Sequence, residues 1–306
     1  MKILRLQKSF SNSNYALIKT VKIIKNKLLN SKLKKIVSYP APLRIIIFIL
    51  LLLISWLPFA GIFYFLLKDD PNLTTIVTMG FLFINFLILT NLWGKHIYQK
   101  SKLFSQYGLV LNRKNAIEVI NHLALALFLT FGLFALENLL GLVKFTTPSL
   151  ALSQLILEGL LCGIGVAFAE ELVFRGWLLY ELEKDYSLKT ALITNSIIFA
   201  LLHFLKPIEE SIRTFPQFPG LILLAITLIF VKRSHQNRLG SCIGLHGGFV
   251  WGYYILNVGE IIQYNDTISP WITGVDKNPI AGLIGLIVLT IIMIINGKIY
   301  QRKNIN

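Results

Sequence analysis

The sequence predicts an all-α fold, a polytopic membrane bundle of about eight transmembrane helices. Hydrophobic residues make up 55% of the 306 residues and charged residues only 15%, and the mean hydropathy of +0.65 is well above that of a soluble domain. The hydrophobic residues lie in continuous runs, most of them near the roughly 20 residues that cross a bilayer as a helix. These runs are rich in Leu and Ile and do not alternate with polar residues, as the strands of an outer-membrane barrel would.

Eight apolar runs follow one another along the chain, and the sixth is the weakest. They cover residues 44–67, 74–94, 122–143, 150–181, 190–206, 220–231, 239–258 and 279–296. No internal repeat, low-complexity linker or soluble domain interrupts them. The predicted division is therefore a basic arm, residues 1–41, followed by one membrane domain, residues 42–300.

The basic arm carries much of the excess charge of the chain. The formal net charge is +15, and ten basic residues precede residue 41 with no acidic residue among them. A basic segment beside a first transmembrane helix is typical of a cytoplasmic anchor on the lipid surface. The arm has neither interleaved aromatic residues nor a recognisable nucleic-acid-binding module. The expected partner is the lipid bilayer, and no nucleic acid is expected.

The charges of the connections predict the orientation. An acidic turn, KDDPN at 68–72, is followed by a basic loop at 95–114, and Lys232, Arg233 and Arg238 come between the sixth and seventh runs. This alternation places both termini in the cytoplasm. The chain is thus expected to be a multi-pass integral protein of a prokaryotic plasma membrane or of an organelle membrane.

Small residues recur at helical spacing in two of the runs. They are Gly159 and Gly163 in the fourth run, and Gly244, Gly248 and Gly252 in the seventh. Such residues let helices approach closely in a membrane, so they predict packing and carry no chemistry.

Three charges stand inside the apolar stretch AFAEELVFRGW, residues 167–177. Ionisable groups at bilayer depth are expensive, so they usually face the protein interior and often mark function. Glu171 and Arg175 are four residues apart and share a helix face, where they can form an ion pair. Glu170 is turned about 100° away and keeps a free carboxylate. The ion pair by itself is explained equally well by a structural role.

Two histidines are expected to join Glu170. The polar hairpin near Tyr186 separates Glu170 from His203 by similar lengths of chain, so two antiparallel helices would bring both residues to one depth. His246 lies near the middle of the seventh run, among glycines that permit close approach. One buried histidine is usually structural, but two beside a glutamate at matching depth predict a site.

Two kinds of chemistry suit this set of residues. Glu170, His203 and His246 could hold a divalent metal ion, zinc above all, that activates a water. Alternatively, Glu170 could activate the water itself while the histidines donate to a developing oxyanion. Both routes lead to hydrolysis of a carbonyl bond, and the sequence leaves them open. The His-Glu-x-x-His, Gly-x-Ser-Gly and Gly-x-Gly-Asp motifs of other intramembrane hydrolases are absent from the sequence.

Three motifs in order resemble those of a known family. EELVFR at 170–175, Phe199 with His203 four residues later, and His246 in GLHGGFVWG are similar to the motifs of the CAAX prenyl endopeptidase and bacteriocin-processing (CPBP, or Abi) intramembrane metalloproteases. The resemblance covers roughly residues 150–258. It implies an eight-helix bundle that cleaves a peptide bond in a membrane-associated protein or peptide.

The resemblance also implies roles for the site residues. Glu170 matches the water-activating glutamate, supported by Glu171 and Arg175, and the two histidines match those that bind metal or stabilise the oxyanion. Many prenyl-processing members have Asn four residues after the last histidine, where this chain has Val250 and so lacks a side-chain donor. The alternatives are a non-catalytic member that acts in partner binding or bacteriocin-type immunity, and a transporter or channel.

Overall fold

The structure, a computed structural model, describes residues 33–305. The chain divides into two compact units, Met1–Leu103 and Phe104–Asn306. Most of the predicted basic arm lies outside the described residues, including eight of its ten basic residues.

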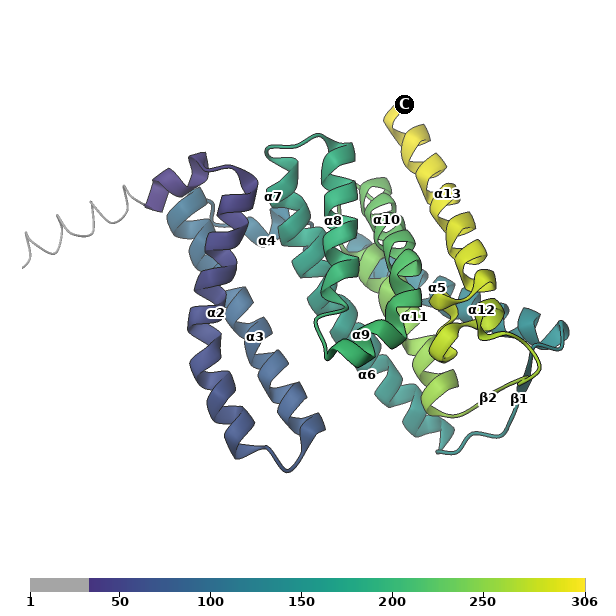
Figure 1. Ribbon diagram of the computed structural model, residues 1–306. Coiled ribbons are helices and arrows are strands. Elements are labelled where there is room, and N and C mark those ends of the chain that lie inside the picture. The colour runs from purple at the N-terminus through teal and green to yellow at the C-terminus, as the bar shows by residue number, and fades with distance from the viewer. Residues whose placement is uncertain (1–32, 306) are drawn as a thin grey trace, which may run out of the picture. The chain divides into compact units, whose positions relative to one another are not determined.

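The first unit is a helical hairpin (Figure 1). After a short 3-10 turn, η1 (Ile36–Ser38), it contains α2 (Ala41–Leu66) and α3 (Pro71–Trp93), and α3 continues as the π-helix η2 (Gly94–Tyr98). The Asp70 side chain caps α3 by accepting a hydrogen bond from the Leu73 amide at 2.9 Å. The KDDPN turn thus forms the tip of the hairpin.

The second unit contains the remaining helices and a short ribbon. Its elements are α4 (Leu103–Gln106, which begins at the boundary), α5 (Arg113–Leu139), β1 (Val143–Phe145), α6 (Leu152–Glu171), η3 (Leu172–Leu178), α7 (Leu179–Glu183), α8 (Leu188–Leu202), α9 (Ile208–Thr214), η4 (Phe215–Gln217), α10 (Phe218–Ser234), α11 (Gly240–Val258), β2 (Ile262–Tyr264), α12 (Pro270–Thr273), η5 (Val275–Lys277), η6 (Pro279–Ala281) and α13 (Leu283–Ile305). β1 and β2 pair antiparallel. The all-α prediction is confirmed, with this small ribbon added.

Six helical segments among the described residues are long and apolar enough to cross a membrane. They are Ala41–Leu66, Pro71–Tyr98, Arg113–Leu139, Leu152–Glu183, Ile208–Ser234 and Leu283–Lys303. The fifth predicted run corresponds to the shorter apolar helix α8, which ends before Pro207. The seventh corresponds to α11, whose glycines and histidine lower its hydropathy. The chain is a multi-pass membrane protein, and eight crossings stay a prediction.

Helix α11 packs closely on α5 and α6 through the predicted glycines. A Cβ atom on Gly244 would overlap the Val119 carbonyl oxygen of α5, and one on Gly248 would lie 2.6 Å from the Leu123 carbonyl oxygen. A Cβ atom on Gly163 of α6 would lie 2.5 Å from the Gly247 carbonyl oxygen. The packing prediction is confirmed, and the result is that α11 can carry His246 into contact with α6.

The fourth segment continues from α6 through η3 to α7 and then turns back into α8 (Figure 1). Ser187 begins α8 by accepting a hydrogen bond from the Thr190 amide at 3.2 Å. The end of α6 and the end of α8 therefore lie at similar distances from one hairpin, as the chain lengths predict.

Candidate active site

Glu171 and Arg175 form a buried ion pair. Arg175 Nη1 donates to Glu171 Oε1 at 2.9 Å, and both side chains are fully buried. The guanidinium also lies over the Phe199 ring, 4.2 Å from its centroid. The predicted pairing is present, and the FxxxH segment of α8 covers it.

The same glutamate orients His246. His246 Nδ1 lies 2.9 Å from Glu171 Oε1. An ionised carboxylate can only accept, so Nδ1 carries the proton and Nε2 is the acceptor in the neutral ring. Glu171 thus joins Arg175 to His246, a link that the sequence pattern did not reveal.

His203, the residue that ends α8, has an equivalent arrangement. Its Nδ1 donates to the Phe199 carbonyl oxygen at 2.8 Å, since a carbonyl can only accept. This contact again leaves Nε2 as the acceptor of a neutral ring. In both imidazoles, therefore, Nδ1 is engaged in a hydrogen bond with the protein and Nε2 is available to another group.

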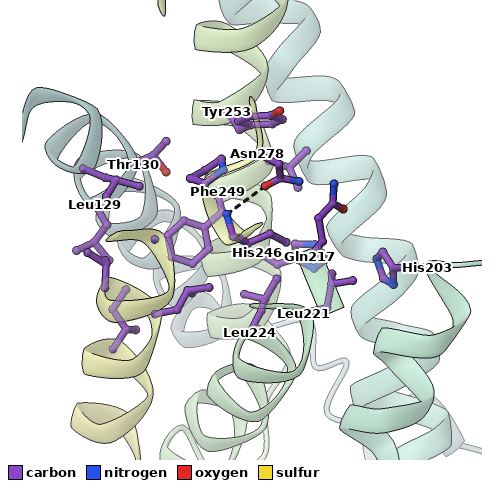
Figure 2. Close-up of a pocket in the computed structure, with 18 of the residues that line it drawn as sticks. Leu129, Thr130, His203, Gln217, Leu221, Leu224, His246, Phe249, Tyr253 and Asn278 are labelled. Carbon is purple, nitrogen blue, oxygen red and sulfur yellow. Dashed lines mark hydrogen bonds between the residues drawn. The ribbon is translucent and has the colours of Figure 1, made fainter. Parts of the chain in front are cut away.

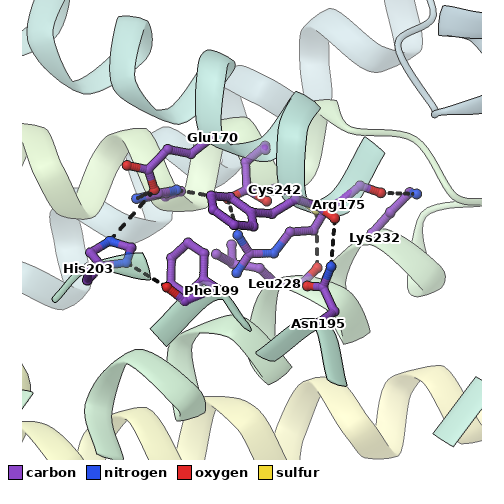
Figure 3. A network of polar contacts seen from close by, with 11 residues as sticks. Glu170, Arg175, Asn195, Phe199, His203, Leu228, Lys232 and Cys242 are labelled. Carbon is purple, nitrogen blue, oxygen red and sulfur yellow. Dashed lines mark hydrogen bonds and ion pairs between the residues drawn. The ribbon is translucent and has the colours of Figure 1, made fainter. Parts of the chain in front are cut away.

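The two Nε2 atoms converge on Glu170. Glu170 Oε2 lies 4.0 Å from His203 Nε2 and 3.9 Å from His246 Nε2 (Figure 3). This oxygen is buried and has no hydrogen-bond partner among the described residues, although the Glu170 side chain as a whole is 29% exposed. The structure thus brings together all three residues that the sequence predicts as neighbours, from α6, α8 and α11.

The spacing of these atoms suits a water better than a tetrahedral zinc ion. A water that makes hydrogen bonds of about 2.8 Å to two groups at roughly a right angle spans about 4 Å between them. Zinc ligands at about 2.0–2.1 Å in tetrahedral geometry stand only about 3.4 Å apart. Among the residues that the structure describes, no group of three His, Cys, Asp or Glu side chains is arranged to hold a metal ion. The donor types suit zinc, but the distances as they stand do not.

An apolar cavity of about 250 Å³ adjoins the two histidines (Figure 2). Its walls come from α5, α8, α10, α11 and α13, and His203 and His246 are part of its lining. Val250, one helical turn after His246, lines it too. Gln217 and Asn278 are among its few polar lining residues. Such a cavity accepts an apolar chain beside the polar groups.

Two buried polar residues that the sequence analysis missed contact the widened turn η3. Asn195 Nδ2 donates to the Phe174 carbonyl oxygen at 2.8 Å, and Lys232 Nζ donates to the Arg175 carbonyl oxygen at 2.6 Å (Figure 3). The prediction that Lys232 lies in a connection is wrong. Lys232 lies within α10 and is only 4% exposed, because α10 extends to Ser234. The signal that could have revealed it is that Lys232 directly follows the apolar run 220–231, where the helix can continue past the last apolar residue.

A second buried ion pair lies in another part of the same unit. Arg238 Nε donates to Glu118 Oε2 at 2.9 Å, and the guanidinium also contacts the other carboxylate oxygen. The hydrogen bond to Glu118 raises the pKa of Arg238 above its usual range. This bidentate pair ties the turn before α11 to α5 and belongs to the scaffold of the site.

Comparison with known proteins gives one match. Residues 152–252 match the family model described as type II CAAX prenyl endopeptidase Rce1-like. The matched segment contains Glu170, Glu171, Arg175, His203 and His246. Comparisons with curated proteins and with solved structures found no match.

Proposed function

We propose that this chain is an intramembrane endopeptidase, because residues 152–252 match the family model described as type II CAAX prenyl endopeptidase Rce1-like. It would hydrolyse a peptide bond in a membrane-associated protein or peptide. One observation supports this most strongly: an unpartnered Glu170 carboxylate oxygen faces the Nε2 atoms of two oriented histidines beside an apolar cavity.

In the proposed reaction a water lies between Glu170 and an imidazole. Glu170 Oε2 accepts a proton from this water while the water oxygen attacks the carbonyl carbon. The resulting oxyanion accepts a hydrogen bond from the Nε2–H of one of the two histidines, which must be in its doubly protonated imidazolium form because its Nδ1 proton is already donated. Protonated Glu170 then passes its proton to the leaving nitrogen as the C–N bond breaks. The products are a carboxyl group and an amine, and Glu170 returns to its starting state.

Glu171 and Arg175 have supporting roles in this scheme. Glu171 fixes the His246 ring through Nδ1, and Arg175 neutralises the Glu171 charge. Arg175 contacts Glu171 and Phe199, and neither charged residue lines the cavity, so neither is proposed to touch the substrate.

The apolar cavity supports a substrate that presents an apolar segment beside the scissile bond. Val250 gives the cavity wall an alkyl surface at the position where many relatives of the prenyl-processing type have Asn. We therefore propose that cleavage proceeds without a side-chain hydrogen bond from position 250 to the oxyanion. The proposed specificity is for an apolar segment and does not require a prenyl group.

Zinc held by Glu170, His203 and His246 stays a prediction, and no step above depends on it. Metal-depleted protein whose cleavage rate rises only when zinc is returned would support it.

Quantitative profiling of protein termini tests the proposal in cells. Wild-type protein and Glu170→Ala are compared at equal membrane abundance, and Glu158→Gln serves as the control. Glu158 is a glutamate of the same helix that hydrogen-bonds to Gln154 and Tyr254, in a different part of the helix from the candidate site. New termini present in wild type and in the control, but absent from Glu170→Ala, would support an endopeptidase. Identical termini in all three strains would favour a non-catalytic partner-binding or immunity protein.

A further inference from the structure

The active-site helix contains a π-helical turn. η3 (Leu172–Leu178) continues directly from the end of α6, immediately after Glu170 and Glu171. A π-helix shifts the backbone bonds from i+4 to i+5 and is rare, and it often occurs at functional sites. The altered register changes which amide reaches each carbonyl, and the Phe174 carbonyl oxygen accepts from the Leu179 N–H, five residues later.

Two buried side chains from other helices also donate to carbonyls of this turn. Asn195 of α8 donates to the Phe174 carbonyl oxygen, and Lys232 of α10 donates to the Arg175 carbonyl oxygen. Asn195 is fully buried and Lys232 is 4% exposed. Two consecutive carbonyls of one π-turn are therefore each held by a different neighbouring helix.

A continuous set of contacts joins these donors to the candidate site. Arg175 receives the Lys232 bond on its backbone, while its side chain donates to Glu171 Oε1 at 2.9 Å. The same Glu171 oxygen lies 2.9 Å from His246 Nδ1. A change in the path of the π-turn would therefore move the Arg175 side chain, and with it the groups that orient His246.

Burial of the Lys232 amine carries a free-energy cost of desolvation. The Lys232 amine loses its hydration inside the bundle, and one short bond to a carbonyl offsets this loss only in part. A helix-to-helix contact for stability alone could use an apolar side chain instead. Such a desolvation cost is expected where a buried polar group holds another part of the structure in position.

We propose that Lys232 and Asn195 are positioning residues that hold the π-turn Leu172–Leu178, and through Arg175 and Glu171 set the orientation of His246. This proposal deepens the proposed endopeptidase function and rests on it for its kinetic consequences. Its structural consequence, the orientation of His246, can be measured without any substrate.

The structural test uses full-length protein with ¹⁵N-labelled histidine in lipid nanodiscs. The His246 Nδ1 proton donated to Glu171 should give a low-field resonance, assigned by its loss in His246→Gln. Lys232→Met removes the donor but keeps a similar length and shape, and it should shift or broaden this resonance. Asn195→Leu is the second variant and should act in the same direction.

Matched controls exist on the same two helices. Thr227 of α10 and Ser196 of α8 are buried, and their hydroxyls bond to carbonyls of their own helices, those of Leu223 and Leu192. Thr227→Val and Ser196→Ala should leave the His246 resonance unchanged. A folded Lys232→Met or Asn195→Leu protein with an unchanged His246 resonance would overturn the proposal.

The kinetic test uses a peptide that spans a Glu170-dependent cleavage site found by terminal profiling. Lys232→Met should lower kcat by about tenfold or more while KM changes by less than about twofold, because misorientation affects the reacting groups more than substrate binding. Thr227→Val should keep both constants. Unchanged kcat in folded Lys232→Met would count against positioning. If wild type itself fails to cleave, the proposed function fails, and the resonance still decides the positioning proposal.

Discussion

Two adjacent glutamates have different surroundings. Glu171 is fully buried and contacts Arg175 and His246, whereas Glu170 is partly exposed and its Oε2 has no partner among the described residues. A buried carboxylate with two charged or polar partners is suited to orient other groups. Each glutamate has an Oε2 without a hydrogen-bond partner among the described residues, but only the partly exposed Glu170 side chain is accessible to a water. The candidate site therefore depends on which face of the helix each glutamate occupies.

The Glu171–Arg175 ion pair should be important for stability. Arg175→Met would leave the Glu171 carboxylate buried without its counter-charge, which typically costs about 3–5 kcal/mol. Thermal unfolding in nanodiscs should show a much lower melting temperature for Arg175→Met than for wild type. The double variant with Glu171→Gln should recover part of that loss. Arg213→Met removes an ion pair with Asp276 that is largely exposed, and it should cost at most about 1 kcal/mol. Equal effects of the two arginine substitutions would contradict the arrangement described.

A second prediction concerns Val250. Asn at this position would lie one turn after His246 on the cavity wall and could donate to the oxyanion. Val250→Asn should therefore raise kcat on a cleaved peptide by several-fold, up to about tenfold, and Val250→Thr serves as a size-matched comparison. A fall in kcat for both variants would show that the position shapes the cavity and does not face the reacting carbonyl.

Much of the site's geometry could be predicted from spacing along the chain. The interval of four residues gave the Glu171–Arg175 pair, and equal chain lengths on either side of the hairpin gave the proximity of Glu170 to His203. The roles of Asn195 and Lys232 could not be predicted, because their partners are backbone carbonyls of a π-turn. A regular period of 3.6 residues contains no sign of such a turn.

At the scale of the elements, close packing of α11 on α5 and α6 decides where His246 lies. Gly244 and Gly248 of α11 face backbone carbonyls of α5, so even a methyl group would collide there. The sequence revealed these contacts because small residues recur at helical spacing. It did not reveal that α8 ends at Leu202, before the end of the predicted run 190–206, because an apolar run does not fix where a helix ends.

The packing of α11 gives a third prediction. Gly244→Ala places a Cβ atom against the Val119 carbonyl oxygen, and overpacking of this kind typically costs about 1–3 kcal/mol. Both the melting temperature and the cleavage rate should fall, because His246 follows Gly244 on the same helix. Gly132→Ala of α5 has nothing within 4 Å of its new Cβ and should be neutral or stabilising. A harmless Gly244→Ala would contradict the observed closeness of α5 and α11.

At the scale of the whole molecule, six segments within residues 33–305 are long and apolar enough to cross a bilayer, and two further helices there, α8 and α11, are shorter or less apolar. The sequence predicted the six because long apolar runs are a strong signal. Whether α8 and α11 also cross depends on how the bundle sits in lipid, which composition does not determine. Eight and six are both even numbers of crossings, so either topology places the two termini on the same side of the membrane.

Cysteine labelling in intact cells distinguishes these topologies. Single cysteines are introduced at Gln236, before α11, and at Asp266, after it, in a background without Cys162 and Cys242. If α11 crosses, an impermeant maleimide should label Asp266→Cys from outside and Gln236→Cys only after permeabilisation. Labelling of both positions, or of neither, from outside would show that α11 does not cross.

The central claim is that Glu170 activates the water that cleaves a peptide bond. Its sharpest test is the cleavage rate of purified Glu170→Gln in nanodiscs, on a peptide that wild type cleaves, with Glu158→Gln measured beside it. Glu170→Gln keeps the size of the side chain but cannot accept the proton, so kcat should fall by about 10²-fold or more while the melting temperature and the Glu158→Gln rate stay at wild-type values. A folded Glu170→Gln protein that cleaves at the wild-type rate would contradict the claim.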